Sequence, residues 1–217
     1  MTALGARTKN VRLGFSVLIP AFRQPSVLAK MGSTLDIISG GRLIMSLGAG
    51  WFKQEYEAYG IPWEEHDDRV AREREAALVM KALWTLSAAS FNGKYYHIKD
   101  AVVEPKPLQK PHPPIWISGN SPKTMELVSE LADGWFMRGP LSEKLRENIA
   151  SVKKAVRGRR MDYVTAIEVP STVKPKEIIE NIWEYVDAGI TLLGINFHDV
   201  EGLEFFAKNV LPTFESS

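Results

Sequence analysis

The sequence predicts an α/β protein built around a mainly parallel sheet. Strand-like and helix-like segments alternate along the 217 residues and give six βα units. A helix must carry the chain back between parallel strands, so repeated βα units imply a parallel sheet. The strand-like segments are nearly continuous apolar runs, as expected of strands covered on both faces. Six units suit an open doubly wound sheet or most of a closed (β/α)8 barrel, and the pattern alone favours neither.

The strands are short apolar runs bounded by turn residues. In chain order they are predicted at Val11–Ile19, Arg42–Gly50, Ile115–Ser118, Gly134–Met137, Tyr163–Val169 and Ile190–Phe197. An Asn-Gly turn at positions 92 and 93 predicts an additional hairpin over Phe91–Val103. The proline-rich stretch Pro105–Pro114 between the hairpin and the third strand must be irregular, because proline donates no backbone hydrogen bond.

The helices follow from apolar residues at helical spacing and from capping residues at their ends. They are predicted at Ser26–Ile38 with Ser26 as N-cap, at Asp68–Thr85, from Ser121-Pro122 onward, and at Ser142–Arg157, Pro175–Ala188 and Glu201–Val210. Glycines end several of them, as expected of helix C-termini. The chain is therefore expected to form one domain over residues 1–217.

Composition excludes several classes of function. The chain has no cysteine, which removes disulfides, cysteine-based zinc sites and thiol nucleophiles. A formal net charge of +1 gives no polybasic field for nucleic acid or an anionic membrane. No apolar run reaches the roughly 18 residues that a membrane span needs. We therefore expect a soluble, cytoplasmic protein that acts on a small molecule.

The stretch from Ile117 to Pro122 is the strongest candidate for a binding site. A strand ends there, Gly119 would let a ligand approach the backbone closely, and Ser121 caps a new helix. The N-terminus of a helix presents backbone N–H groups and the positive end of its dipole, and both favour a phosphate. The alternative is an ordinary βα turn followed by a capped helix. Asn120, Lys123 and Thr124 would supply further polar groups.

Other polar groups give weaker indications. Gly48-Ala49-Gly50 follows a strand but lacks the third glycine of a dinucleotide loop, so these glycines more simply allow close approach to the backbone. No pair of histidines has metal-ligand spacing, so no metal site is expected. His198 lies beside Asp199 at the end of the last strand, which permits either a proton relay or a structural role. Arg69, Arg72 and Arg74 are expected to form a solvated helix face with nearby carboxylates.

Taken in order, several motifs resemble the luciferase-like (bacterial luciferase) superfamily. They are LDIISGGRLIMSLGAGW, EYEAYG, the KALWT that ends the long helix, EPKPLQKPHPP, IWISGNSP and LADGW. The branch that looks most similar contains the F420-dependent oxidoreductases, which are similar to methylenetetrahydromethanopterin reductase. Ala3–Gly14 resembles the end of that family's second helix and the start of its third strand. The first two βα units are therefore expected to be missing from this chain.

The resemblance implies a (β/α)8 barrel of the TIM type, incomplete and with an inserted β-hairpin, that binds F420 or FMN. It implies cofactor contacts from Ser16 and Val17, where relatives have a bulge with a non-proline cis peptide. It implies further contacts from Gly50 and from the segment that opens the helix, namely Gly119, Asn120, Ser121, Lys123 and Thr124. Some similar deazaflavin enzymes carry a glutamate where Trp51 stands, and no residue of this chain is identified as catalytic. A homodimer is expected.

Three functions stay open at this point. The first is hydride transfer between F420 or FMN and a small organic substrate, with the protein orienting the cofactor. The second is an FMN-dependent monooxygenase, which needs a dry pocket. The third is a non-catalytic flavin-binding or structural protein, because a barrel without two strands exposes sheet edges.

Overall fold

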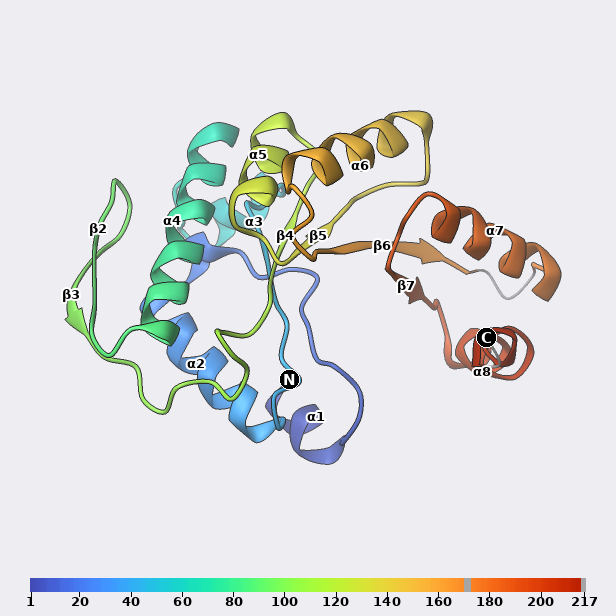
Figure 1. Cartoon of the computed structure of the whole chain (residues 1–217), viewed down its shortest axis with the longest axis horizontal. Helices are drawn as coiled ribbons and strands as arrows, with labels where there is room; N and C mark the ends of the chain where they lie inside the picture. Colours follow the sequence, from blue (N-terminus) through green and yellow to red (C-terminus); the bar gives the residue numbers. More distant parts are fainter. Residues whose placement is uncertain (170–172, 216–217) are drawn as a thin grey trace. The chain divides into compact units, whose positions relative to one another are not determined.

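Parallel strands and the helices between them make up both halves of the chain (Figure 1). The computed structural model describes residues 1–169 and 173–215. The described residues group into two compact units, Met1–Asp133 (unit 1) and Gly134–Ser217 (unit 2).

Unit 1 contains one pair of parallel strands, one hairpin and several helices. The strands β1 (Met45–Gly48) and β4 (Ile115–Ser118) pair in parallel, and β2 (Ala89–Asn92) pairs antiparallel with β3 (His97–Ala101). The helices are α1 (Thr2–Arg7), the short 3-10 helix η1 (Pro20–Phe22), α2 (Pro25–Ile38), α3 (Lys53–Ala58), α4 (His66–Thr85) and α5 (Pro122–Leu131).

Unit 2 repeats the βα pattern with three parallel strands. The strand β6 (Asp162–Glu168) lies between β5 (Gly134–Phe136) and β7 (Leu192–Asn196) and pairs in parallel with both. The helices of this unit are α6 (Glu143–Ala155), α7 (Pro175–Asp187), α8 (Val200–Asn209) and α9 (Pro212–Glu215). Ser142 caps α6, as expected, and its hydroxyl accepts a hydrogen bond from the N–H of Leu145 at 3.2 Å.

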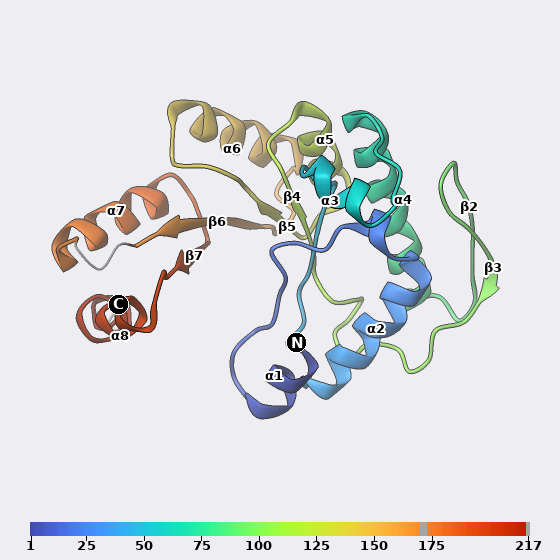
Figure 2. The same cartoon turned by 180° about the vertical axis from the view of Figure 1, so that it is seen from behind.

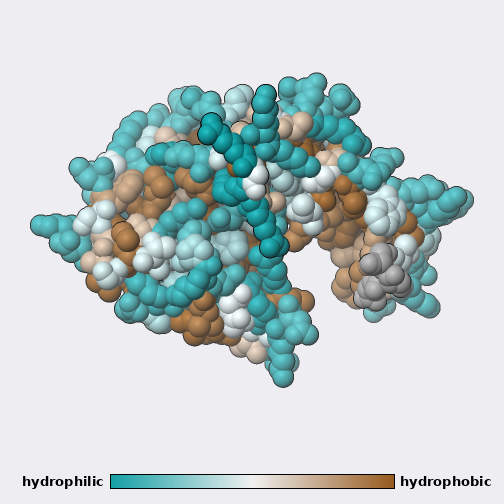
Figure 3. Space-filling view, in the orientation of Figure 1, coloured by the Kyte–Doolittle hydropathy of each residue, from teal (hydrophilic) through white to brown (hydrophobic). Residues whose placement is uncertain are grey.

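The core of unit 1 lies between β1, β4 and the helices α2 and α4. Trp84 is almost fully buried there, and its indole N–H donates to the carbonyl of Ala29 across 2.9 Å. Apolar residues also reach the surface shown in Figure 3, and α2 leaves Val27, Met31 and Ile38 exposed. The core of unit 2 surrounds the buried Trp135 of β5.

The predicted strand Val11–Ile19 is wrong as a continuous strand. Only two isolated bridges form, between Leu13 and Leu43 and between Leu18 and Leu47. Five steps along this segment therefore lie opposite four steps of its neighbour, so the segment bulges by one residue. The run of apolar residues predicts extended backbone, but it cannot reveal an extra residue in the pairing.

Two helix starts also differ from the prediction. Helix α2 begins at Pro25 with Gln24 as N-cap, so Ser26 is not the cap. Proline is favoured at the first helical position because its φ is already helical and its missing N–H would have no partner there. Helix α4 begins at His66, two residues before the predicted Asp68, and both Asp67 and Asp68 occupy its first turn.

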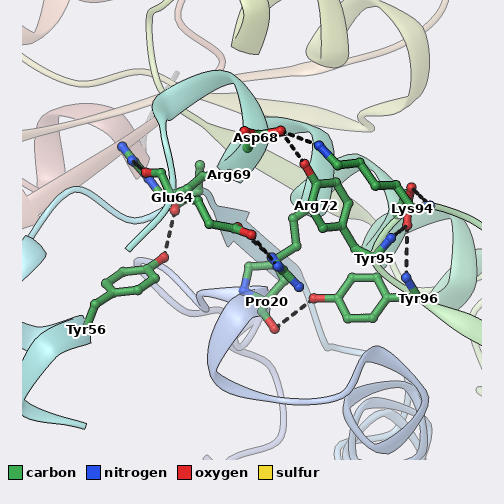
Figure 4. Close-up of polar contacts among 11 residues, drawn as sticks. Pro20, Tyr56, Glu64, Asp68, Arg69, Arg72, Lys94, Tyr95 and Tyr96 are labelled. Atoms are coloured by element: carbon green, nitrogen blue, oxygen red, sulfur yellow. Dashed lines mark hydrogen bonds and ion pairs between the residues drawn. The ribbon is translucent and has the colours of Figure 1, made fainter. Parts of the chain in front are cut away.

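The arginines of α4 do not form a solvated face. Arg69 is buried, with its guanidinium 3.8 Å above the ring of Trp63. Arg72 makes two hydrogen bonds to Glu64, at 2.8 and 2.5 Å, as Figure 4 shows. Arg74 binds Glu130 of α5. These arginines join α4 to other segments, and sequence spacing within one helix cannot predict such pairs.

The predicted hairpin is confirmed, but its turn lies at 93–96 and not at Asn92-Gly93, because Asn92 pairs with His97. A carboxylate from α4 holds this turn. Glu75 accepts hydrogen bonds from the backbone N–H groups of Lys94, Tyr95 and Tyr96, at 2.7, 2.8 and 3.1 Å. Asp68 reaches the same turn, where it accepts from the Lys94 ammonium and the Tyr95 hydroxyl (Figure 4). The turn is therefore positioned from outside the hairpin.

Replacing Glu75 with alanine should loosen this turn. Each hydrogen bond to a charged group contributes about 1.5–3 kcal/mol, and exposed amides recover part of that from water, so we expect a net loss of about 2 kcal/mol. Hydrogen exchange should speed up at the amides of Lys94, Tyr95 and Tyr96. The control is Glu57→Ala, which removes only an exposed ion pair with Lys53. Unchanged protection at these three amides in the Glu75 variant would contradict the assignment.

A single side chain fixes the N-terminal segment. Arg42 donates to the carbonyls of Gly5, Thr8 and Val11 and to the hydroxyl of Thr8, at 2.6 to 2.9 Å. It also donates to the carbonyl of Ser39 at the end of α2, at 2.5 Å. Helix α1 consequently lies beside the C-terminal end of α2, which Figure 2 shows from behind.

Candidate functional site

The carboxyl ends of β1 and β4 form one edge of the sheet in unit 1. The two strands pair in parallel from Met45 with Ile115 to Gly48 with Ser118. The loops that follow, 49–52 and 119–121, therefore leave the sheet at the same edge. In parallel α/β sheets this is the edge where ligands bind.

Ser16 and Val17 join this edge, as the resemblance predicted. The Gly48 N–H donates to the carbonyl of Leu18 at 3.0 Å, so the bulged segment runs directly along the end of β1. A methyl group on Gly48 would lie 2.6 Å from Cγ2 of Val17, which only glycine avoids. The peptide bond between Ser16 and Val17 is cis. Gly48 therefore belongs to this site, although the resemblance implied a cofactor contact only from Gly50.

Gly50 is required by its conformation and by the side chain beneath it. Its φ is +81°, and an added methyl group would overlap the hydroxyl of Tyr56 and lie 2.8 Å from the ring carbon Cε2. The Tyr56 hydroxyl donates to the carbonyl of Ala49 at 2.9 Å. Burial raises the pKa of Tyr56 to about 12, so the hydroxyl keeps its proton at neutral pH. This buried tyrosine therefore fixes the loop after β1.

The helix α5 begins at the same edge with the predicted cap. Ser121 is the N-cap, and its hydroxyl accepts from the N–H of Thr124 at 3.1 Å and lies 2.9 Å from the Thr124 hydroxyl. Gly119 has a φ of +134°, and a methyl group on it would lie 3.2 Å from Cγ2 of Thr124.

Helix α5 offers an anion fewer free backbone N–H groups than the N-terminus of a helix usually presents. Pro122 has no N–H, and the N–H of Thr124 is already bonded to Ser121. The amide of Lys123 is left in the first turn to meet a ligand. The Lys123 ammonium is half exposed and lies 3.3 Å from Glu126. The anion-binding chemistry here would combine one amide, one cation and small hydroxyls.

Two buried polar atoms lie on one face of the β1–β4 pair. Ser46 and Trp116 are register partners, so their side chains share a face. A methyl group on Gly32 of α2 would lie 3.6 Å from the Met45 sulfur, so Met45 faces the helices and Ser46 faces the opposite side. Within residues 1–169 and 173–215, neither the Ser46 hydroxyl nor the Trp116 indole N–H has a hydrogen-bond partner. Buried polar groups of this kind normally meet water or a ligand.

The residues that are present therefore fit a flavin-type cofactor. The start of α5 supplies donors for an anionic group, and the glycines keep the backbone of the neighbouring loops free of side chains. All eight predicted cofactor residues belong to unit 1, in three segments that meet at one edge. Sequence reasoning missed Ser46 and Trp116, because their relation depends on pairing between strands 70 residues apart.

Of the two roles left open for His198 and Asp199 in unit 2, the proton relay does not form. Asp199 caps α8, and its carboxylate accepts from the N–H of Gly202 at 2.7 Å. His198 instead lies 3.1 Å from the carboxylate of Glu168, and both side chains are exposed. The described residues contain no group of three or more acidic or histidine side chains that could hold a metal ion.

Two further observations concern the described residues. One is a groove of about 420 Å³ along α2, which reaches the edge at Phe15 and Leu18, on either side of Ser16 and Val17, but is lined by none of the eight predicted residues. Among the described residues, no helix combines the length and the apolar character that crossing a bilayer would require.

Comparison with solved structures confirms the fold. The coenzyme F420-dependent tetrahydromethanopterin reductase from Methanopyrus kandleri superposes with a TM-score of 0.84 at 18% identity, over 98% of this chain and 86% of that one. The fold is therefore the predicted α/β fold with mainly parallel strands, a partial barrel of the TIM type.

Comparison with characterised sequences gives two groups of relatives. The FMNH2-dependent dimethylsulfone monooxygenase of Pseudomonas putida is 34% identical over 151 residues, which is 70% of this chain and 41% of that protein. The F420-dependent glucose-6-phosphate dehydrogenase of Amycolatopsis mediterranei is 30% identical over 193 residues, 88% of this chain and 52% of that protein. The chain thus spans about half the length of these relatives.

A family model covers nearly the whole sequence. The model described as luciferase-like monooxygenase matches residues 1–209, which includes every segment of the candidate site. The chain therefore belongs to the luciferase-like monooxygenase family.

Proposed function

We propose that this protein is an oxidoreductase that uses F420 or FMN to transfer hydride to or from a small organic substrate. One observation carries the proposal: three segments distant in sequence, at 16–17, 48–50 and 119–124, meet at the carboxyl edge of β1 and β4. The family contains both F420-dependent and FMN-dependent relatives, which supports either cofactor.

Each segment would have its own part in holding the cofactor. The first turn of α5, with Ser121, Lys123 and Thr124, would bind an anionic group of the cofactor tail. Gly119 and Asn120 would allow that group close to the backbone. Ser16, Val17 and Gly50 would contact the ring system from the end of β1. The cofactor supplies the redox chemistry when bound, while these residues orient it and exclude water.

An FMN-dependent monooxygenase is the second candidate. The relative from Pseudomonas putida that is named for this chemistry shares 34% identity over 70% of the chain. Some similar deazaflavin enzymes carry a glutamate where Trp51 stands, and the absence of a carboxylate at this position favours chemistry that requires no acid there. A titration that shows binding of FMN and not of F420 would favour this candidate.

The proposal is tested by titrating the protein separately with FMN and F420 and following cofactor fluorescence. Ser121→Ala should weaken binding about tenfold, equivalent to 1.4 kcal/mol. The matched control is Ser142→Ala, which removes the equivalent cap from α6 in unit 2. Each variant loses about 1 kcal/mol of helix stability, so only the effect on cofactor affinity separates them. Binding of neither cofactor, or an equal effect of the two variants, would overturn the proposal.

Several finer expectations accompany this proposal. We propose that residues 1–217 belong to a single barrel domain, and the family match across residues 1–209 supports this. A cytoplasmic homodimer stays a prediction, and light scattering with cofactor present would test the oligomeric state. A monomer that binds cofactor without turnover would favour the non-catalytic alternative.

A further inference from the structure

Two aromatic side chains stand exposed at the edge where the candidate site lies. Trp51 and Phe52 follow Gly50 directly, and their side chains are 75% and 45% exposed. Their ring centroids are 5.4 Å apart with the planes tilted by 40°, so the rings form one continuous surface. We call this pair the aromatic platform. A contiguous apolar surface beside a binding site commonly marks the place where a ligand docks.

A buried aromatic base supports the platform. Tyr56 lies under Gly50 and holds Ala49 through its hydroxyl. Its ring packs edge-on against Phe22 at 4.8 Å and against Trp63 at 5.0 Å. The loop that carries Trp51 is therefore anchored by interior contacts, and the exposure of the indole is a property of an ordered loop.

The loop that carries the platform has no charge of its own. The loop GAGWF, residues 48–52, has no charged side chain. Lys53 follows at once, but it pairs with Glu57 at 3.4 Å and offers little net charge. An anionic substrate such as a sugar phosphate would need a cation to compensate for its loss of water, and Lys123, the cation placed at this edge, is assigned to the cofactor tail. The platform favours an uncharged ligand.

We propose that the aromatic platform binds the substrate, and that the substrate is a small, uncharged organic molecule with a flat or extended apolar face. This inference rests on the proposed function, because that function places the cofactor at the same edge. Aromatic rings contribute both apolar area and stacking, so they can hold a substrate that lacks charged groups. Trp51 would then determine specificity without taking part in proton transfer.

The test uses 1-naphthol as a neutral aromatic probe and glucose 6-phosphate as an anionic one, with binding measured by calorimetry. We expect 1-naphthol to bind and Trp51→Ala to weaken it about tenfold, equivalent to 1.4 kcal/mol. Trp51→Phe should keep most of the affinity, because it restores an aromatic face. Glucose 6-phosphate should bind more weakly than 1-naphthol.

The chain provides a matched control in unit 2. Trp183 is 42% exposed and lies 5.4 Å from Phe214 with a tilt of 46°, which closely resembles the geometry of the platform. Trp183→Ala should leave probe binding unchanged. An equal loss in this variant would reveal non-specific adsorption to exposed rings, and it would overturn the inference. Three other results would also overturn the inference. They are unchanged binding of 1-naphthol to Trp51→Ala, no binding of 1-naphthol to the wild type, and tighter binding of glucose 6-phosphate than of 1-naphthol.

A cofactor titration separates this inference from the proposed function. Trp51→Ala should bind FMN or F420 as the wild type does, because the platform serves the substrate. Loss of cofactor affinity in this variant would assign the platform to the cofactor and overturn the inference, while the proposed function would stand. Failure of the wild type to bind either cofactor would overturn the proposed function, and the 1-naphthol result would still report on the platform.

Discussion

Replacing Glu73 with leucine should stabilise the protein at neutral and alkaline pH. Glu73 lies on the inner face of α4 and is 1% exposed, and neither carboxyl oxygen has a hydrogen-bond partner within the described residues. An unpartnered carboxyl is among the most unfavourable groups to bury. Leucine has a similar size and fills the same space with apolar atoms.

The stabilisation should depend on pH with a definite sign. Burial raises the pKa of Glu73 from 4.5 to about 8. Between these two values the unfolded chain releases the proton while the folded protein keeps it, so rising pH favours unfolding. The wild type should lose at most about 1.4 kcal/mol per pH unit over this window through Glu73. Below pH 4.5 this loss is absent, and above about pH 8 it is complete.

Urea unfolding of the wild type and of Glu73→Leu from pH 5 to pH 9 provides the measurement. The difference between the two free energies of unfolding cancels the titration of the other groups, including the histidines. This difference should grow with pH up to about 8 and then level off. Glu73→Gln should remove the pH dependence while keeping an unpartnered polar group. A difference that does not change with pH would show that the carboxyl finds a partner in solution.

Gly50→Ala should destabilise the protein more than the same change at Gly60. Both glycines have a left-handed backbone, with φ of +81° and +67°, and alanine there costs about 1–2 kcal/mol. Nothing lies within 4 Å of a methyl group on Gly60, whereas one on Gly50 overlaps Tyr56. Moving Tyr56 would break its bond to Ala49 and disturb the aromatic base, so we expect a total loss of about 3–4 kcal/mol.

Thermal unfolding and near-ultraviolet circular dichroism would measure this pair of variants. The circular dichroism signal should change in Gly50→Ala, because the aromatic rings around Tyr56 are displaced. Gly60→Ala should keep the wild-type spectrum and lose stability only through its backbone. Equal losses in the two variants would mean that the loop moves without disturbing Tyr56.

Rules that use only neighbouring residues correctly predicted the elements that depend only on neighbouring residues. The strand Ile115–Ser118 has the predicted bounds, and Ser121 caps the next helix as expected. Both depend on residues that are adjacent in sequence. The bulge between Leu13 and Leu18 was implied only by the family resemblance, because it exists only relative to β1 and the apolar run looks the same with or without it.

The individual segments of the candidate site could be predicted from the sequence, but the way they come together could not. The glycines and the start of α5 carry local signals, but the pairing of Ser46 with Trp116 appears only when β1 and β4 lie side by side. The small number of free N–H groups at the start of α5 could be predicted from the sequence. Pro122 follows the cap Ser121 directly and has no N–H, and Thr124 stands at the position whose N–H a serine cap binds. The support that Tyr56 gives to Gly50 could not be predicted, because it depends on how the loop after β1 folds over the Tyr56 side chain.

The contacts of Arg42 couple the hydrogen bonds of Gly5, Thr8 and Val11 to a single side chain. One guanidinium provides the donors for Gly5, Thr8 and Val11, so a change in its rotamer would release the three residues together. Lysine could not substitute, because a single ammonium cannot span acceptors that are spread over a planar fork. Trypsin cleaves after lysine and arginine, and Lys9 is exposed. We expect trypsin to cut after Lys9 only in molecules in which these hydrogen bonds are broken. The cleavage rate would therefore report the fraction of such molecules.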